Sequence, residues 1–173
     1  MILATFALAD KSFQLRRAVE SDVGPIIELI ARDQLRAAVE SAAPERREPY
    51  VAAFRAIDAD PAHLLCVVEG VVGEGAVGEG ATGEVVATMQ LTFLPGMARS
   101  GATRLQIEAV RVDEQLRGLG LGGAMITWAV DEARRRGAAL VQLTSDASRL
   151  DAHRFYERLG FTQSHAGFKL QLP

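Results

Sequence analysis

A glycine-rich turn at residues 117–122, RGLGLG, stands between a strand pattern and a helix pattern. Ahead of it, residues 105–112 alternate β-branched and polar side chains, as a half-buried strand does. After it, apolar residues recur at helical spacing from Leu121 until Gly137 stops the pattern. Bare glycine backbone can approach an anion closely, and a helix start adds unpaired N–H groups and a positive dipole end. The turn therefore predicts a pyrophosphate-binding loop.

Two other nucleotide-binding motifs compete for this turn. Gly118, Gly120 and Gly123 satisfy the dinucleotide fingerprint G-x-G-x-x-G. Asp146 also lies roughly where a ribose-binding carboxylate is expected. However, that fingerprint begins at the end of its strand, whereas residues 113–117 intervene here, and too little chain follows for a doubly wound sheet. A Walker loop needs Gly-Lys-Ser/Thr after its last glycine, and Gly-Gly-Ala stands there instead. Both alternatives are disfavoured.

Two segments resemble the motifs of a known family. Residues 110–122, VRVDEQLRGLGLG, are similar to motif A of the GNAT N-acetyltransferase superfamily, whose pattern is Arg/Gln-x-x-Gly-x-Gly/Ala. Residues 152–161, AHRFYERLGF, resemble its motif B, in which Ala-x-x-aromatic/aliphatic-Tyr is followed by Gly-Phe. The order of strand, loop, helix, second strand and tyrosine helix also agrees. The resemblance covers roughly the last 70 residues of the chain.

The resemblance implies a single acyl-CoA-binding N-acetyltransferase domain over residues 1–173, with acetyl-CoA as the cosubstrate. It assigns the contacts with CoA to these residues: Val110, Val112, Arg117, Gly118, Leu119, Gly120, Leu121, Gly122 and Arg149. The backbone of the two valines would bind the pantetheine arm, so that the thioester lies beside the middle of the motif A strand. Arg149 stands where many members carry an asparagine that contacts this arm.

The reaction calls for a base and an acid on opposite sides of the acetyl group. An alkylammonium cannot attack a thioester until it loses a proton, and the departing thiolate gains by receiving one. Glu108 is the candidate base, acting through water, and this role calls for burial beside its apolar neighbours. A surface or ion-paired strand residue is the alternative. The resemblance places the Tyr156 hydroxyl near the CoA sulfur as the candidate acid, with a core tyrosine as the alternative.

Composition limits the classes of partner. The chain has 173 residues, 49% of them hydrophobic, which suits one globular domain with a real core. A net charge of −3 supplies no basic field, so no nucleic-acid partner is expected. Cys66 is the only cysteine, which excludes an intrachain disulfide and a multi-cysteine zinc site, and no metal site is predicted. Its apolar surroundings, LLCVV, predict a buried structural thiol.

Residues 1–9 are apolar but lack a basic leader and are too short to span a bilayer. We therefore expect a cytoplasmic protein with no membrane segment. The partner would be a small-molecule or peptide amine, whose identity the sequence leaves open. A homodimer is compatible with the sequence, although no sequence signal supports it.

The expected fold is α/β (mixed α+β) and GNAT-like. It has a largely antiparallel, twisted sheet of about seven strands, flanked by about four helices. A splayed central parallel pair would join residues 105–112 to residues 139–144 through a crossover helix at 121–136. Two further strands are expected after the tyrosine helix. Residues 70–83 are predicted to form a flexible, expanded hairpin loop.

Two other functions stay open. A noncatalytic acyl-CoA-binding sensor or regulatory domain could use the same fold. An NAD-dependent oxidoreductase, in third place, would rest on the dinucleotide fingerprint alone. The presence of both Glu108 and Tyr156 favours the enzyme.

Overall fold

The computed structural model describes residues 1–32, 47–70 and 83–172. Its strands are β1 (Ile2–Leu8), β2 (Lys11–Arg17), β3 (His63–Gly70), β4 (Val85–Leu94), β5 (Arg104–Val112) and β6 (Leu140–Leu143). Its helices are α1 (Val23–Ala31), α2 (Arg47–Ala59), α3 (Ala98–Gly101), α4 (Leu121–Arg135) and α5 (Leu150–Arg158), with single 3-10 turns η1 (Glu20–Asp22) and η3 (Glu114–Leu116). None of these helices is both long and apolar enough to cross a membrane. The predicted loop at 70–83 lies almost entirely outside the described residues.

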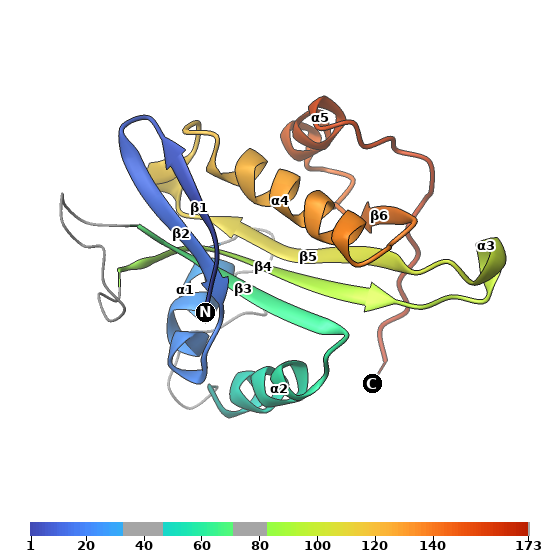
Figure 1. Ribbon diagram of the computed structural model, residues 1–173, viewed down its shortest axis with the longest axis horizontal. Coiled ribbons are helices and arrows are strands. Elements are labelled where there is room, and N and C mark those ends of the chain that lie inside the picture. The colour runs from blue at the N-terminus through green and yellow to red at the C-terminus, as the bar shows by residue number, and fades with distance from the viewer. Residues whose placement is uncertain (33–46, 71–82, 173) are drawn as a thin grey trace.

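The strands form one sheet in the order β1-β2-β3-β4-β5-β6. Every neighbouring pair is antiparallel except β5 and β6, which are parallel and joined by α4. In Figure 1, α4 and α5 lie on one side of the sheet, and α1 and α2 on the other. The expected GNAT-like fold is therefore confirmed, and the parallel doubly wound sheet of a dinucleotide-binding enzyme is absent from the described chain. The parallel pair sits at an edge of the sheet rather than at its centre, because nothing described pairs with the outer side of β6.

The sheet has six strands rather than about seven, and the two ends of the chain account for the difference. The expected strands after α5 are not formed, because residues 162–172 contain neither helix nor strand. Phe168, Leu170 and Leu172 have a strand-like alternation there but are 95%, 87% and 81% exposed. A strand needs a ladder partner, and no described strand pairs with this segment. Conversely, the apolar start of the chain forms β1, which the sequence did not predict.

Two apolar clusters hold the layers together. The larger one packs α4 onto the sheet through residues such as Leu121 and Met125 against Leu105 and Ile107. The smaller one packs α1 and α2 onto β3 through Leu65 and Val67, with Val85 of β4 at its border. Cys66 is completely buried in β3, as predicted, and burial raises the pKa of its thiol to about 12. The thiol is therefore neutral and inert in the folded protein.

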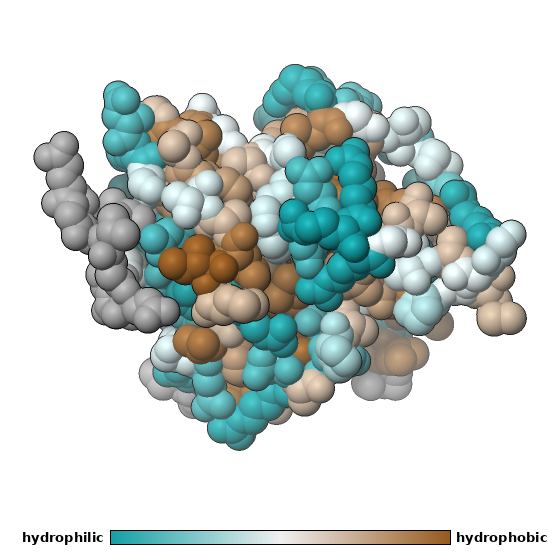
Figure 2. Space-filling view, viewed as in Figure 1, coloured by the Kyte–Doolittle hydropathy of each residue, from teal (hydrophilic) through white to brown (hydrophobic). Residues whose placement is uncertain are grey.

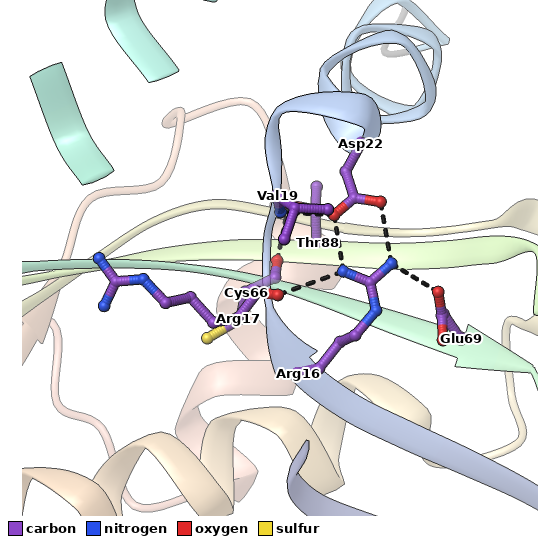
Figure 3. Close-up of polar contacts among 7 residues, drawn as sticks. All are labelled: Arg16, Arg17, Val19, Asp22, Cys66, Glu69 and Thr88. Atoms are coloured by element: carbon purple, nitrogen blue, oxygen red, sulfur yellow. Dashed lines mark hydrogen bonds and ion pairs between the residues drawn. The ribbon is translucent and has the colours of Figure 1, made fainter. Parts of the chain in front are cut away.

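A buried ionic cluster fastens η1 to the sheet (Figure 3). Arg16 Nη1 donates to Asp22 Oδ2 at 2.6 Å, and Arg16 Nη2 donates to Glu69 Oε1 at 2.5 Å. Asp22 also accepts from the backbone N–H of Val19 at 2.7 Å. These hydrogen bonds, first of all that to Asp22, raise the pKa of Arg16 despite its burial. One arginine of β2 thus balances two carboxylates, one from η1 and one from β3.

The arginine run that closes α4 is neutralised by its own helix. Figure 2 shows hydrophilic side chains gathered over the C-terminal end of α4. Arg134 pairs with Asp131 at 2.6 Å, and both Arg135 and Arg136 pair with Glu132 at 2.6 Å. The run therefore does not form a free basic patch.

Candidate functional site

The parallel strands β5 and β6 diverge halfway along β5. They pair only from Arg104 with Leu140 to Ile107 with Leu143, whereas β5 continues to Val112. Beyond Ile107 the β6-facing side of β5 has no strand partner among the described residues. The N–H of Asp113 donates to the carbonyl of Val86 in β4 at 2.8 Å. Because the N–H and C=O groups of successive strand residues point to opposite sides, those of Val110 and Val112 point away from β4, into the opening between β5 and β6. This is the splay that the fold prediction expected.

A β-bulge at Ala109 sits where the strands diverge. Ala109 has a φ of +51°, and the register between β4 and β5 shifts there. Because of the extra residue, Val110 joins the core side that Leu105 and Ile107 also face. Glu108 lies on the opposite face and is exposed. The burial expected for Glu108 is therefore wrong, because its apolar neighbours occupy the core side of the strand.

The glycine turn forms an open cradle at the start of α4. Gly118 and Gly120 have φ values of +84° and +86°, which L side chains rarely adopt. A Cβ atom added at Gly118, Gly120 or Gly123 would meet nothing within 4 Å. Gly120 is also the N-cap of α4 and has no side chain to accept from the first helical N–H groups. An oxyanion fits this cradle.

The residues around the cradle differ in whether their side chains are exposed to solvent or buried in the core. Arg117 is exposed and pairs with Glu114 at 3.1 Å. Leu119 is half-buried, and Leu121 is 1% exposed within the core, so these two can reach a ligand chiefly through backbone. A Cβ at Gly122 would lie 3.6 Å from Phe155 Cζ. This is an ordinary van der Waals distance, and it places Phe155 of α5 beside the start of α4, so that the two sequence motifs lie next to each other.

Tyr156 of α5 lies at the border of the larger apolar cluster, against which Val110 and Val112 also pack. It is half-buried, with ring centroids 5.0 Å from Phe155 and 5.9 Å from Phe161. Burial raises the pKa of its hydroxyl, while the charges of Arg111 and Arg149 act to lower it. The raised pKa means that Tyr156 keeps its proton at neutral pH. The side chain is therefore both part of the core and a possible proton donor.

Two arginines stand near Tyr156. Arg149 is half-buried at the N-cap position of α5, where its N–H donates to the carbonyl of Asp146 at 3.0 Å. Arg111 was not singled out from the sequence, although it lies between two residues assigned to the pantetheine arm. Its Nη1 donates to the carbonyl of Val110 at 2.7 Å. Two positive charges thus act on a neutral phenol.

Comparisons with known proteins indicate the family of the chain. The sequence profile of the acetyltransferase (GNAT) family matches residues 28–161. The aminoalkylphosphonate N-acetyltransferase of Salmonella typhimurium is 43% identical over 63 residues, which are 36% of this chain and 41% of that protein. The glucosamine 6-phosphate N-acetyltransferase of Trypanosoma brucei brucei is 36% identical over 88 residues, which are 51% of this chain and 58% of that protein. The chain thus matches less than two thirds of either enzyme.

A solved structure matches over nearly the whole length. The crystal structure described as a transcriptional regulator from Bacillus halodurans C-125 superposes with a TM-score of 0.82 and 36% sequence identity. The match covers 92% of this chain and 99% of that one.

Proposed function

The chain belongs to the GNAT acetyltransferase family, and on that premise we propose that it transfers an acetyl group from acetyl-CoA to a primary amine. The observation that carries the proposal is the open glycine cradle at the start of α4, beside the splay of β5 and β6. The cradle would hold the pyrophosphate through backbone N–H groups, with Arg117 at its rim. The backbone of Val110 and Val112 would hold the pantetheine arm, and Arg149, whose charge acts on Tyr156, would contact the same arm.

The reaction is a direct attack within a ternary complex. Glu108, acting through water, would take one proton from the ammonium group of the acceptor. The freed nitrogen then attacks the thioester carbon, and the C–S bond breaks as the C–N bond becomes an amide. Tyr156 would give its proton to the departing thiolate and regain one from the nitrogen of the tetrahedral intermediate through water. The products are the acetylated amine, CoA thiol and one released proton.

The names of the relatives support an amine acceptor. Both curated enzymes act on amines that carry a phosphorus oxyanion, judging by their names. The Bacillus halodurans protein, described as a transcriptional regulator, favours a second candidate, a noncatalytic acyl-CoA-binding regulator. Mixing the protein with acetyl-CoA and a panel of amines separates the two. The enzyme releases CoA thiol in the presence of an acceptor, whereas a regulator binds acetyl-CoA without releasing it.

Replacing Tyr156 with phenylalanine is expected to lower kcat about 10- to 100-fold, the range for loss of a general acid, while the Kd for acetyl-CoA stays nearly constant. The ring and its packing are retained, and only the hydroxyl is lost. Tyr50→Phe on α2 is the matched control, because it removes the other tyrosine hydroxyl of the chain. Wild-type turnover in Tyr156→Phe would leave Tyr156 as a core residue only.

Replacing Glu108 with glutamine is expected to slow turnover and to shift or remove the acidic limb of the kcat/KM profile. Glutamine keeps the size and hydrogen bonding of the side chain but cannot accept the proton. The amine itself can produce a similar limb, so the comparison between variant and wild type is the informative measurement. Glu84→Gln, at another exposed glutamate, controls for the change of charge. An unchanged rate and profile would mean that the amine loses its proton elsewhere.

A further inference from the structure

The sheet face opposite α4 is apolar only in part. Leu65 and Val67 of β3 pack there with Ala18 beneath α1 and α2, and α1 also lies against β4 and β5. Over β4, β5 and β6, alternation places polar side chains on the same face. These residues are Gln90, Thr92, Arg104, Gln106, Glu108 and Gln142. We call this set the polar face; it includes the exposed Glu108 and borders the splay.

One row of the polar face crosses four strands. The pairing register aligns His63 with Thr92, Thr92 with Gln106, and Gln106 with Gln142. Thr92 Oγ1 and His63 Nδ1 are 3.0 Å apart, and Gln142 Nε2 donates to Gln106 Oε1 at 2.8 Å. Each side-chain amide has two N–H groups and two lone pairs, so these contacts fix the amides and leave capacity for a ligand. The row offers both hydrogen-bond donors and acceptors.

Three members of the polar face have no partner of their own. The side chains of Gln90, Arg104 and Glu108 form no hydrogen bond or ion pair with any other residue in the described ranges. Gln90 lies directly opposite Glu108, and the Nε atom of half-buried Arg104 is shielded from solvent. Gln90 is half-buried and Glu108 is exposed, so their amide and carboxylate groups are accessible and keep their hydrogen-bonding capacity for a ligand.

We propose that the polar face binds the acceptor and selects a hydroxyl-bearing primary amine with an oxyanion at its far end. This inference rests on the proposed acetyl transfer. Glu108 would bind the ammonium end of the acceptor beside the thioester. The side-chain amides of Gln106 and Gln142 would bind the hydroxyl groups, and Arg104 would bind the oxyanion through charge-assisted hydrogen bonds. The acceptor would therefore lie along β5.

The dimensions of the polar face restrict the acceptor further. Glu108 and Arg104 are four residues apart in one strand, about 13 Å between Cα atoms at the usual rise. The row from β4 to β6 crosses two strand spacings, about 10 Å. Such an area accommodates one hexose ring with a charged substituent. We expect an α-amino acid or a short aminoalkyl oxyanion to bind less well, because it spans less of the distance between Glu108 and Arg104.

Four amines test this selection in the thiol-release assay: glucosamine 6-phosphate, glucosamine, cyclohexylamine and 2-aminoethylphosphonate. Cyclohexylamine has a ring without hydroxyl groups, and 2-aminoethylphosphonate has the two charges without the length. We expect kcat/KM to be highest for glucosamine 6-phosphate and about 100-fold or more lower for cyclohexylamine, because a site built for hydroxyl groups rejects an analogue that lacks them. Glucosamine should lie between these two.

Substitutions locate the contacts. Arg104→Met should raise KM for glucosamine 6-phosphate roughly 10-fold or more and leave KM for glucosamine unchanged. Gln106→Met should raise KM for both sugars about 10-fold, in the range for one lost hydrogen bond to a substrate. Gln14→Met on β2 is the matched control and should change neither. Calorimetry with CoA should give wild-type affinity for all three variants, which excludes general unfolding as the cause.

The outcomes separate this inference from the proposed function. Equal use of cyclohexylamine or 2-aminoethylphosphonate, or an unchanged KM in both Arg104→Met and Gln106→Met, would overturn the inference while acetyl transfer stands. If none of the four amines releases thiol, calorimetric titration of glucosamine 6-phosphate into the CoA complex decides. Binding that Arg104→Met weakens would keep the polar face as a binding site without transfer. Absent binding would overturn it.

Discussion

A Gly120→Val variant is expected to bind acetyl-CoA on the order of 100-fold more weakly than the wild type, because it loses one or two charge-assisted hydrogen bonds between backbone and pyrophosphate. The added side chain would fill the open space of the cradle and would force the backbone away from a φ of +86°. Isothermal titration calorimetry with acetyl-CoA measures the effect. The change in backbone strain needs its own control.

Gly137→Val supplies that control at the other end of α4. Gly137 has a φ of +71°, and a Cβ there would also meet nothing within 4 Å. The two glycines are separated by the length of α4, about 22 Å for its 15 residues. Both variants should lose similar stability, about 1–2 kcal/mol for a left-handed residue. Equal loss of affinity in both, or in neither, would contradict the assignment of the cradle to the pyrophosphate.

An Arg16→Met variant is expected to lose about 3–5 kcal/mol of unfolding free energy, because it leaves buried Asp22 and Glu69 without a compensating charge. Urea denaturation near neutral pH, followed by circular dichroism, gives the free energy. The variant Arg16→Met/Asp22→Asn/Glu69→Gln removes all three charges and should recover much of the loss.

Arg55→Met tests whether removing any ion-paired arginine would lower the unfolding free energy as much as Arg16→Met does. Arg55 pairs with Glu20 at 2.9 Å, but both side chains are more than half exposed. Exposed ion pairs contribute little, so this variant should unfold at nearly the wild-type urea concentration. A similar loss in Arg55→Met and Arg16→Met would show that the buried cluster has no special role in stability.

Local signals in the sequence were sufficient for the second half of the fold. The glycine turn, the apolar stripe that begins at Leu121 and the stop at Gly137 act over a few residues each, and α4 forms where they predict it. The same holds for α5, which carries Tyr156. In these segments helix capping, glycine conformation and periodicity all favour one structure.

Features that depend on pairing between strands were not predictable in this way. The turn between β1 and β2 places Ala9 and Asp10 at positive φ, without the glycine that usually marks such a hairpin. The bulge at Ala109 is likewise a nonglycine residue at positive φ, and its position depends on the register with β4. Without the bulge, the exposure of Glu108 and the place of Arg111 beside the splay could not be inferred.

The complete burial of Cys66 in β3 gives the molecule an internal reporter. Only a thiolate reacts quickly with alkylating or disulfide-exchange reagents, and a thiol with its pKa raised to about 12 offers almost none at neutral pH. A colorimetric reagent that counts free CoA therefore reads no background from the folded enzyme. Iodoacetamide would label Cys66 only in molecules whose central strands have separated. The rate at which Cys66 is labelled at increasing urea concentrations would then measure how often the sheet opens at β3.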